Sequence, residues 1–263
     1  RKIVLYCIVQ LRREGRLMIN EVHQGDCLEI LKQVPDGSVD MVLCDLPYGT
    51  TRCKWDTIIP FEPLWDEYRR VAKKNAAIVL TAAQPFTSVL IASNLKEFKY
   101  NWVWEKSKAT GYLNAKKMPM RAHEDVCVFY RKPPTYNPQM WESTPYNKGS
   151  AHRPTEVYGK QKEVLVKNDT GLRYPRTVQY FKTAESEGKV YHPTQKPISL
   201  FRYLIETYTN EGEVVLDSCL GAGTTALAAL SCNRNFIGME LAEEYVKISR
   251  DRIKEYKIKL DLS

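Results

Sequence analysis

Two groups of residues in this chain have the types and spacing needed for chemistry, and the first is Asp45-Leu46-Pro47-Tyr48. The Asp45 carboxylate can accept N–H protons. Pro47 restricts the backbone, so the carbonyl of Leu46 can be a second acceptor. Tyr48 offers a flat face on which a ring can stack. Together these residues suit a reaction at an amino group on an aromatic ring. Such an amino group is a poor nucleophile, because its lone pair is delocalised into the ring. Taken alone, the tetrapeptide could equally be a plain turn.

The second group is Asp217, Gly221-x-Gly223-x-x-Ala226 and Glu240, the last standing 17 positions after Gly223. The glycines let the backbone come close to a ligand, and Glu240 can bind a ribose diol. Asp217 precedes the glycine turn, where a carboxylate repels phosphate and attracts an amino group. S-adenosylmethionine has an amino group, a sulfonium and a ribose but no phosphate. The pattern therefore favours this cofactor over a dinucleotide, which stays an alternative together with an empty turn.

Asp26, which follows Gly25, is a candidate for a second polar contact to the same cofactor. A short helical run begins directly after it. In that position an aspartate is more often a helix N-cap.

The elements that must position these residues alternate along the chain. Short apolar or β-branched runs predict strands at 39–45, 76–81, 98–105, 125–130, 213–217 and 235–240. Helical spacing predicts helices at 63–74, 85–93, 198–208, 225–233 and 243–256, with Pro197 at a first helical position. Alternating strands and helices predict an α/β fold with a doubly wound, mostly parallel sheet. Asp45 and Asp217 then both lie at carboxyl ends of strands, where such sheets bind ligands.

The net charge of +8 is concentrated in the middle of the chain. Residues 107–189 contain 15 basic and 8 acidic residues, and residues 107–122 contain no acid. We interpret 107–122 as a mobile basic loop and 132–189, which has no regular periodicity, as an inserted loop-rich region. This placement favours a polyanion partner, although a solvated basic face is an alternative.

The remaining composition excludes several classes. Seven cysteines without a CxxC motif favour a reduced, cytoplasmic compartment. The four histidines lack metal-ligand spacing, so we expect no metal. No apolar run approaches the roughly 20 residues of a membrane span. We expect residues 1–17 to be an upstream extension outside the fold, which would begin at Met18.

The sequence resembles the β class of amino-methylating DNA methyltransferases, on motifs found in the family's order. The catalytic motif is Asp45-Leu46-Pro47-Tyr48-Gly49, with Leu46 where the family usually has a first Pro. The cofactor motif is 216–225, with Ser218-Cys219 where Pro-Phe is usual. Three further segments match at 192–197 (HPTQKP), 123–129 (HEDVCVF) and 236–240 (FIGME).

This resemblance implies a Rossmann-like class I methyltransferase with a seven-stranded sheet and circularly permuted motif order. Its catalytic half would be 18–131, its target-recognition region 132–189 and its cofactor-binding half 190–263. The resemblance adds Thr194, Gln195, Lys196 and Thr224 to Asp26, Asp45, Asp217, Gly221, Gly223 and Glu240 as candidates for binding S-adenosylmethionine.

The implied partner is double-stranded DNA, with a homodimer as a further expectation, in a prokaryotic or phage-encoded restriction-modification setting. Candidate phosphate contacts are Lys108, Lys116, Lys117 and Arg121, and candidates for groove contact or stacking are Tyr136, Tyr146, Arg153, Tyr158, Arg173 and Arg176.

The resemblance implies the N6 of adenine as the methylated atom, because the family's adenine enzymes usually begin the catalytic motif with Asp, as Asp45 does here, and its cytosine enzymes more often begin it with Ser. The N4 of cytosine is the main alternative. An RNA or protein-amide methyltransferase, a dinucleotide oxidoreductase and an inactive DNA-binding module are the others.

Overall fold

The computed structural model describes residues 19–51, 53, 56–151 and 164–262. The expected extension at 1–17 lies outside them. The chain forms two compact units: Pro138–Arg176 is one, and the residues before 138 together with those after 176 form the other. The separate unit is therefore narrower than the predicted region 132–189. Among the described residues, no helix is both long enough and apolar enough to cross a bilayer.

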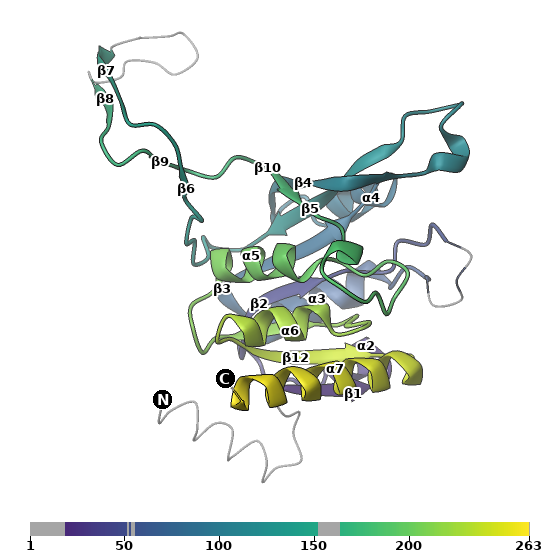
Figure 1. Ribbon diagram of the computed structural model, residues 1–263. Coiled ribbons are helices and arrows are strands. Elements are labelled where there is room, and N and C mark those ends of the chain that lie inside the picture. Colours follow the sequence, from purple (N-terminus) through teal and green to yellow (C-terminus); the bar gives the residue numbers. More distant parts are fainter. Residues whose placement is uncertain (1–18, 52, 54–55, 152–163, 263) are drawn as a thin grey trace. The chain divides into compact units, whose positions relative to one another are not determined.

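The larger unit has an α/β fold that is built on one β-sheet (Figure 1). Its strands are β1 (Glu21–Gln24), β2 (Val39–Cys44), β3 (Ala72–Ala82), β4 (Phe98–Thr110), β5 (Arg121–Phe129), β10 (Val178–Phe181), β11 (Val214–Asp217) and β12 (Asn235–Glu240). Their order is β1-β12-β11-β2-β3-β5-β4-β10. All neighbours are parallel except the two pairs that contain β5. The predicted fold class is confirmed.

The sheet has eight strands rather than the expected seven, because β10 joins its edge beside β4. This strand comes from the region interpreted as loops. Its side chains alternate between exposed and half-buried, and its Phe181 carbonyl accepts a hydrogen bond from the Trp104 indole at 2.9 Å. Four residues in an irregular stretch are too short a run to show a period-2 pattern against their surroundings.

Helices cover both faces of this sheet, as a doubly wound fold requires (Figure 1). Apolar side chains of α2 (Cys27–Leu31), α3 (Phe61–Val71) and α4 (Phe86–Ser93) form one core cluster with the sheet. Those of α5 (Ile198–Tyr208), α6 (Thr224–Ser231) and α7 (Glu243–Asp261) form the other. In β2, Val42 and Cys44 belong to the first cluster and Met41 and Leu43 to the second. This two-sided burial explains the continuous apolar run.

The chain leaves the centre of the sheet in opposite directions after β2 and after β11. β2 leads to β3 on one side, while β11, which pairs with β2, leads to β12 on the other. Such a switch point opens a crevice beyond the carboxyl ends of the two strands. Asp45 follows β2 and Asp217 ends β11, so the topology brings the two predicted acids together.

Several local expectations were wrong. The helix expected at 63–74 ends at Val71, because β3 begins at Ala72. Residues 107–122 are not a loop throughout, because β4 continues to Thr110 and β5 begins at Arg121, with a short 3-10 helix, η1 (Tyr112–Asn114), between them. Pairing between β4 and β5 extends both strands into the basic segment, although the sequence there lacks the apolar residues that predict a strand. Pro197 caps α5 rather than occupying its first helical position, since its ψ of 139° is extended.

The smaller unit contains two short antiparallel ribbons. One pairs β6 (Trp141–Glu142) with β9 (Leu172–Arg173), and the other pairs β7 (Tyr146–Ala151) with β8 (Val164–Asn168). The Arg173 guanidinium lies over the Tyr146 ring, 4.6 Å from its centroid. This contact adds to the backbone pairing that holds the described part of the unit together.

Candidate active site

A cavity of about 830 Å³ lies beyond the carboxyl ends of β2 and β11. Its lining includes the whole of Asp45-Leu46-Pro47-Tyr48. It also includes the predicted cofactor residues Asp26, Thr194, Gln195, Lys196, Asp217, Gly221, Thr224 and Glu240. Of the predicted cofactor set, only Gly223 does not line it. Residues that are far apart in the chain thus share one cavity within the larger unit.

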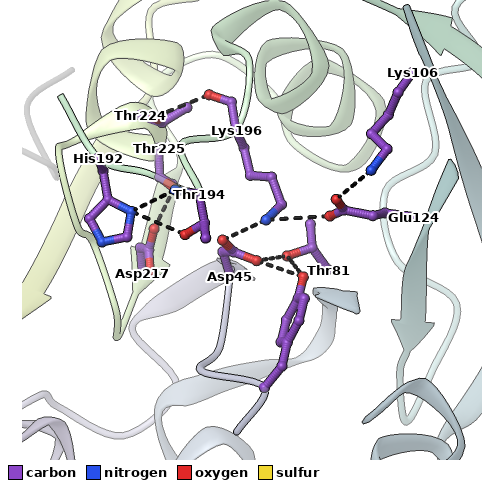
Figure 2. Close-up of polar contacts among 11 residues, drawn as sticks. Asp45, Thr81, Lys106, Glu124, His192, Thr194, Lys196, Asp217, Thr224 and Thr225 are labelled. Carbon is purple, nitrogen blue, oxygen red and sulfur yellow. Dashed lines mark hydrogen bonds and ion pairs between the residues drawn. The ribbon is translucent and has the colours of Figure 1, made fainter. Parts of the chain in front are cut away.

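Three side chains hold the Asp45 carboxylate (Figure 2). Its Oδ1 accepts hydrogen bonds from the Tyr48 hydroxyl at 2.8 Å and from the Thr81 hydroxyl. Its Oδ2 accepts one from Lys196 Nζ at 2.7 Å. Because a carboxylate offers about four lone-pair sites, one site remains on Oδ2 for a further donor.

Tyr48 and Leu46 are fixed by the core beneath the cavity. The Tyr48 ring stacks on Phe86 with centroids 5.0 Å apart and planes at 20°, so one face of the ring is covered. Burial and the charge of Asp45 raise the pKa of Tyr48 well above its ordinary value, which keeps its hydroxyl neutral and a donor. The Leu46 side chain is buried, which fits the prediction that this position acts through its backbone.

Lys196 joins the catalytic motif to a second carboxylate. Its side chain is 6% exposed and lies 2.7 Å from Asp45 Oδ2 and 3.4 Å from Glu124 Oε2. Lys106 Nζ contacts the other oxygen of Glu124 at 3.2 Å. Burial lowers the pKa of Lys196, but the Asp45 and Glu124 carboxylates outweigh it, so the pKa is raised above its ordinary value. Lys196 is therefore an ammonium here.

Asp217 is buried at the start of the glycine turn. It accepts hydrogen bonds from the Cys219 N–H at 2.9 Å and from the Thr225 hydroxyl. Burial nonetheless raises its pKa to about 6 against those bonds. The turn needs glycine at Gly221 and Gly223, whose φ angles of 53° and 89° are left-handed. An anionic carboxylate facing a close-packed turn suits a cationic group better than a phosphate.

Glu240 fixes the glycine turn from the neighbouring strand. Its two oxygens accept hydrogen bonds from the Gly221 and Ala242 N–H groups, each at 2.8 Å. Each oxygen keeps a further lone pair for a ligand hydroxyl. Asp26 caps α2 by accepting the Leu28 N–H at 2.8 Å, so the alternative given for it from sequence is correct, and it also lines the cavity.

The segment before α5 is held largely by its own side chains. The Thr194 hydroxyl contacts His192 Nδ1 at 3.1 Å, and Gln195 Oε1 accepts the Tyr191 N–H at 3.0 Å. The Thr224 hydroxyl donates to the Lys196 carbonyl at 3.4 Å and so joins this segment to the glycine turn.

The candidate DNA contacts fall into separate groups. Lys108, Lys116, Lys117 and Arg121 are exposed on the β4–β5 hairpin and its connection, and Lys108 and Arg121 line the cavity. Arg173 is half-buried and donates to the carbonyls of Thr144, Gly171 and Leu172, which favours a structural role. Arg176 is exposed. Arg153 and Tyr158 lie outside the described residues. Tyr136 is in the larger unit and contacts Tyr208.

Sequence reasoning missed four polar residues around the catalytic motif, namely Asp56, Thr81, Lys106 and Glu124. Thr81 ends an apolar run, and Glu124 stands between the basic segment and the apolar residues of β5. A polar residue at the end of a buried strand can indicate a functional site. The residue with which it forms a hydrogen bond or ion pair depends on the order of the strands in the sheet.

Asp56 anchors the loop after the catalytic motif, because its carboxylate accepts the N–H groups of Gly49, Thr50 and Thr51 at 2.8, 2.9 and 2.6 Å. Burial opposes ionisation, but these bonds lower the pKa of Asp56. We expect Asp56→Ala to slow catalysis and to reduce the free energy of unfolding by about 1–3 kcal/mol, measured by initial rates and denaturant titration. Asp36→Ala, which removes an exposed carboxylate, is the control. Equal losses in both variants would contradict this role.

Known proteins with the same fold define the class. The crystal structure of an M1.HpyAVI–SAM complex superposes with a TM-score of 0.62 at 23% identity, covering 89% of this chain and 98% of that one. PvuII DNA methyltransferase, which is cytosine-N4-specific, gives 0.61 at 16% identity, covering 89% and 90%. The larger unit thus has the fold of a class I methyltransferase, as predicted.

The sequence comparisons then identify the family. Type II methyltransferase M1.MboII of Moraxella bovis is 29% identical over 253 residues, 88% of this chain and 95% of the relative. M.HindIII of Haemophilus influenzae, also a type II methyltransferase, is 24% identical over 313 residues, 90% and 96%. The model of the N6/N4 DNA methylase family matches residues 39–251. The chain belongs to this family, which confirms the resemblance drawn from its motifs.

Proposed function

We propose that this chain is a site-specific methyltransferase that moves a methyl group from S-adenosylmethionine to the exocyclic N6 of an adenine in duplex DNA. The observation that carries the proposal is the shared cavity, in which the Asp45 motif and the Asp217 turn meet at adjoining strand ends. Family membership supplies DNA as the substrate class. The type II relatives support recognition of a specific site.

The residues on the Asp217 side fit S-adenosylmethionine. Asp217 provides a carboxylate for its amino group, and Glu240 keeps lone pairs for its ribose hydroxyls. The solved complex of a protein with this fold holds the same cofactor. When bound, S-adenosylmethionine would supply an activated methyl group to the amino nitrogen, and the proton that this nitrogen gives up would leave to water.

The residues on the Asp45 side act on the amino group. Asp45 accepts an N–H hydrogen bond through Oδ2, which draws electron density toward the nitrogen and holds it in place. Tyr48 and Thr81 orient the carboxylate from its other oxygen. The base must leave the duplex to reach this cavity, at a cost of a few kcal/mol. Stacking of the base on the face of the Tyr48 ring that does not contact Phe86 would offset part of this cost.

Adenine is favoured over cytosine by the resemblance, since the adenine enzymes of the family usually begin the motif with Asp, as Asp45 does here. Cytosine N4 is the second candidate, because PvuII DNA methyltransferase, a cytosine-N4 enzyme, shares the fold. An RNA or protein-amide substrate is disfavoured by membership of a DNA methylase family.

The test is transfer of a labelled methyl group to duplex DNA, followed by digestion to nucleosides and mass detection. We expect label in N6-methyladenine. Label only in N4-methylcytosine would overturn the choice of base, and label only in RNA or protein substrates would overturn DNA as the substrate.

The exposed lysines of the β4–β5 connection should bind phosphates. We expect Lys116→Ala/Lys117→Ala to weaken duplex binding and to reduce the magnitude of the slope of log affinity against log salt by about 1.8. Binding releases fewer counterions from the DNA when two phosphate contacts are lost. Fluorescence anisotropy over a salt series measures both. Lys247→Ala/Lys254→Ala on α7 removes the same charge elsewhere and should leave the slope unchanged. Parent affinity of the first variant at all salt concentrations would contradict the assignment.

A further inference from the structure

A row of alternating charges, in which the two lysines are buried and the two carboxylates half-buried, runs from the catalytic carboxylate to the base of the β4–β5 hairpin. It consists of Asp45, Lys196, Glu124 and Lys106, joined at 2.7, 3.4 and 3.2 Å (Figure 2). The side chains of Lys196 and Lys106 are 6% and 4% exposed. Two anions balance two cations, so the row is neutral as a whole.

Lys196 Nζ lies 5.4 Å from the centroid of the Tyr48 ring and contacts two carboxylates unequally. Nζ makes a short hydrogen bond to Asp45 Oδ2, whereas the buried Glu124 Oε2 lies 3.4 Å from Nζ and accepts no hydrogen bond from any of the described residues. The Lys196 backbone is held by the Thr224 hydroxyl and by the start of α5. The flexible side chain can therefore move between the two carboxylates while the backbone stays in place. A buried acceptor without a donor is costly, so Glu124 favours that movement.

The contact to Asp45 opposes the reaction of the proposed function. An ammonium on Oδ2 neutralises the charge that should attract the N–H group of the base. The nitrogen also gains positive charge as it takes the methyl group, and a cation on the same carboxylate repels that charge. A second anion is needed to hold Lys196 while Asp45 acts.

We propose that Glu124 is a positioning residue that takes Lys196 from Asp45 when the target amino group enters the cavity. In this arrangement Lys196 pairs with Glu124 Oε2, and Asp45 Oδ2 accepts the amino N–H. Lys106 holds Glu124 Oε1 and so keeps Oε2 directed at Lys196. The inference rests on the proposed function.

The first variant is Glu124→Gln, which keeps the shape of the side chain and removes its charge. Lys196 then stays on Asp45, and single-turnover methyl transfer at saturating cofactor should slow on the order of 10²-fold. Cofactor and duplex affinities should remain at parent values. Glu124→Asp, which keeps the charge and withdraws the carboxylate by one methylene, should show a smaller loss. Thermal unfolding confirms that each variant is folded.

The second variant distinguishes positioning from a merely structural role. Lys196→Met added to Glu124→Gln removes one cation as well, so the row, which has a net charge of +1 in the single variant, is neutral again and Asp45 Oδ2 is free of the ammonium. We expect this double variant to transfer methyl about tenfold faster than Glu124→Gln alone. If Glu124 served only to support the fold, the second substitution would add a further loss.

A parent rate in folded Glu124→Gln would overturn the inference and leave the proposed function standing. So would a double variant no faster than Glu124→Gln. A parent chain that transfers no methyl group to DNA would overturn the proposed function, and this inference with it.

Discussion

Asp45→Asn should slow methyl transfer about 10²–10⁴-fold. The substitution keeps the size of the side chain but removes the charge that accepts the amino N–H. It also places an amide donor beside Lys196, 2.7 Å from the position of Oδ2. The measurement is a single-turnover rate with labelled cofactor and saturating duplex DNA. The variant should keep its cofactor affinity within about tenfold, since Asp217 and Glu240 are untouched.

Asp66→Asn is the matched control, because Asp66 is an exposed aspartate on α3 that pairs only with Arg69 among the ion pairs of the described chain. We expect the parent rate from it. Parent activity in Asp45→Asn itself would show that the carboxylate is not the required acceptor of the amino N–H, and would leave the backbone carbonyl of Leu46 as the other candidate acceptor.

Asp217→Asn should weaken binding of S-adenosylmethionine about 10- to 100-fold, since a hydrogen bond to a charged group contributes about 1.5–3 kcal/mol. The parent should show a matching pH dependence. Burial raises the pKa of Asp217 to about 6, so the carboxylate is protonated at lower pH and no longer attracts an ammonium. Affinity should therefore fall below about pH 6, as measured by calorimetry.

Stability without ligand should change in the opposite direction. Because the pKa of Asp217 is raised in the folded chain, its contribution favours folding at low pH and is lost as pH rises through about 6. Asp251→Asn, an exposed aspartate on α7, should retain the parent affinity and its pH dependence. A pH-independent parent affinity, or an unchanged affinity in Asp217→Asn, would contradict the placement of the amino group.

Much of this site could be predicted from sequence because its parts are local. β2, β11 and β12 are short apolar runs buried on both faces, so each run and its terminal acid can be seen without tertiary information. The turn from Gly221 to Gly223 requires left-handed backbone, for which glycine is the usual residue. Asp26 likewise caps the helix that directly follows it.

The partners of those residues could not be predicted, because they depend on which strands become neighbours. Thr81 reaches Asp45 because β3 lies beside β2. Glu124 reaches Lys196 because β5 runs antiparallel to β3 and brings its first half to the cavity. Lys106 carries no local sign that it is buried. β10 was missed because it gains stability from β4 rather than from its own four residues.

The most direct test of the proposed activity is single-molecule sequencing of DNA from a bacterial host that expresses this chain, compared with DNA from a host that expresses Asp45→Asn. We predict N6-methyladenine at one recurring sequence with the parent and none at that sequence with the variant. Unmodified DNA with the parent, or N4-methylcytosine in place of N6-methyladenine, would contradict the account.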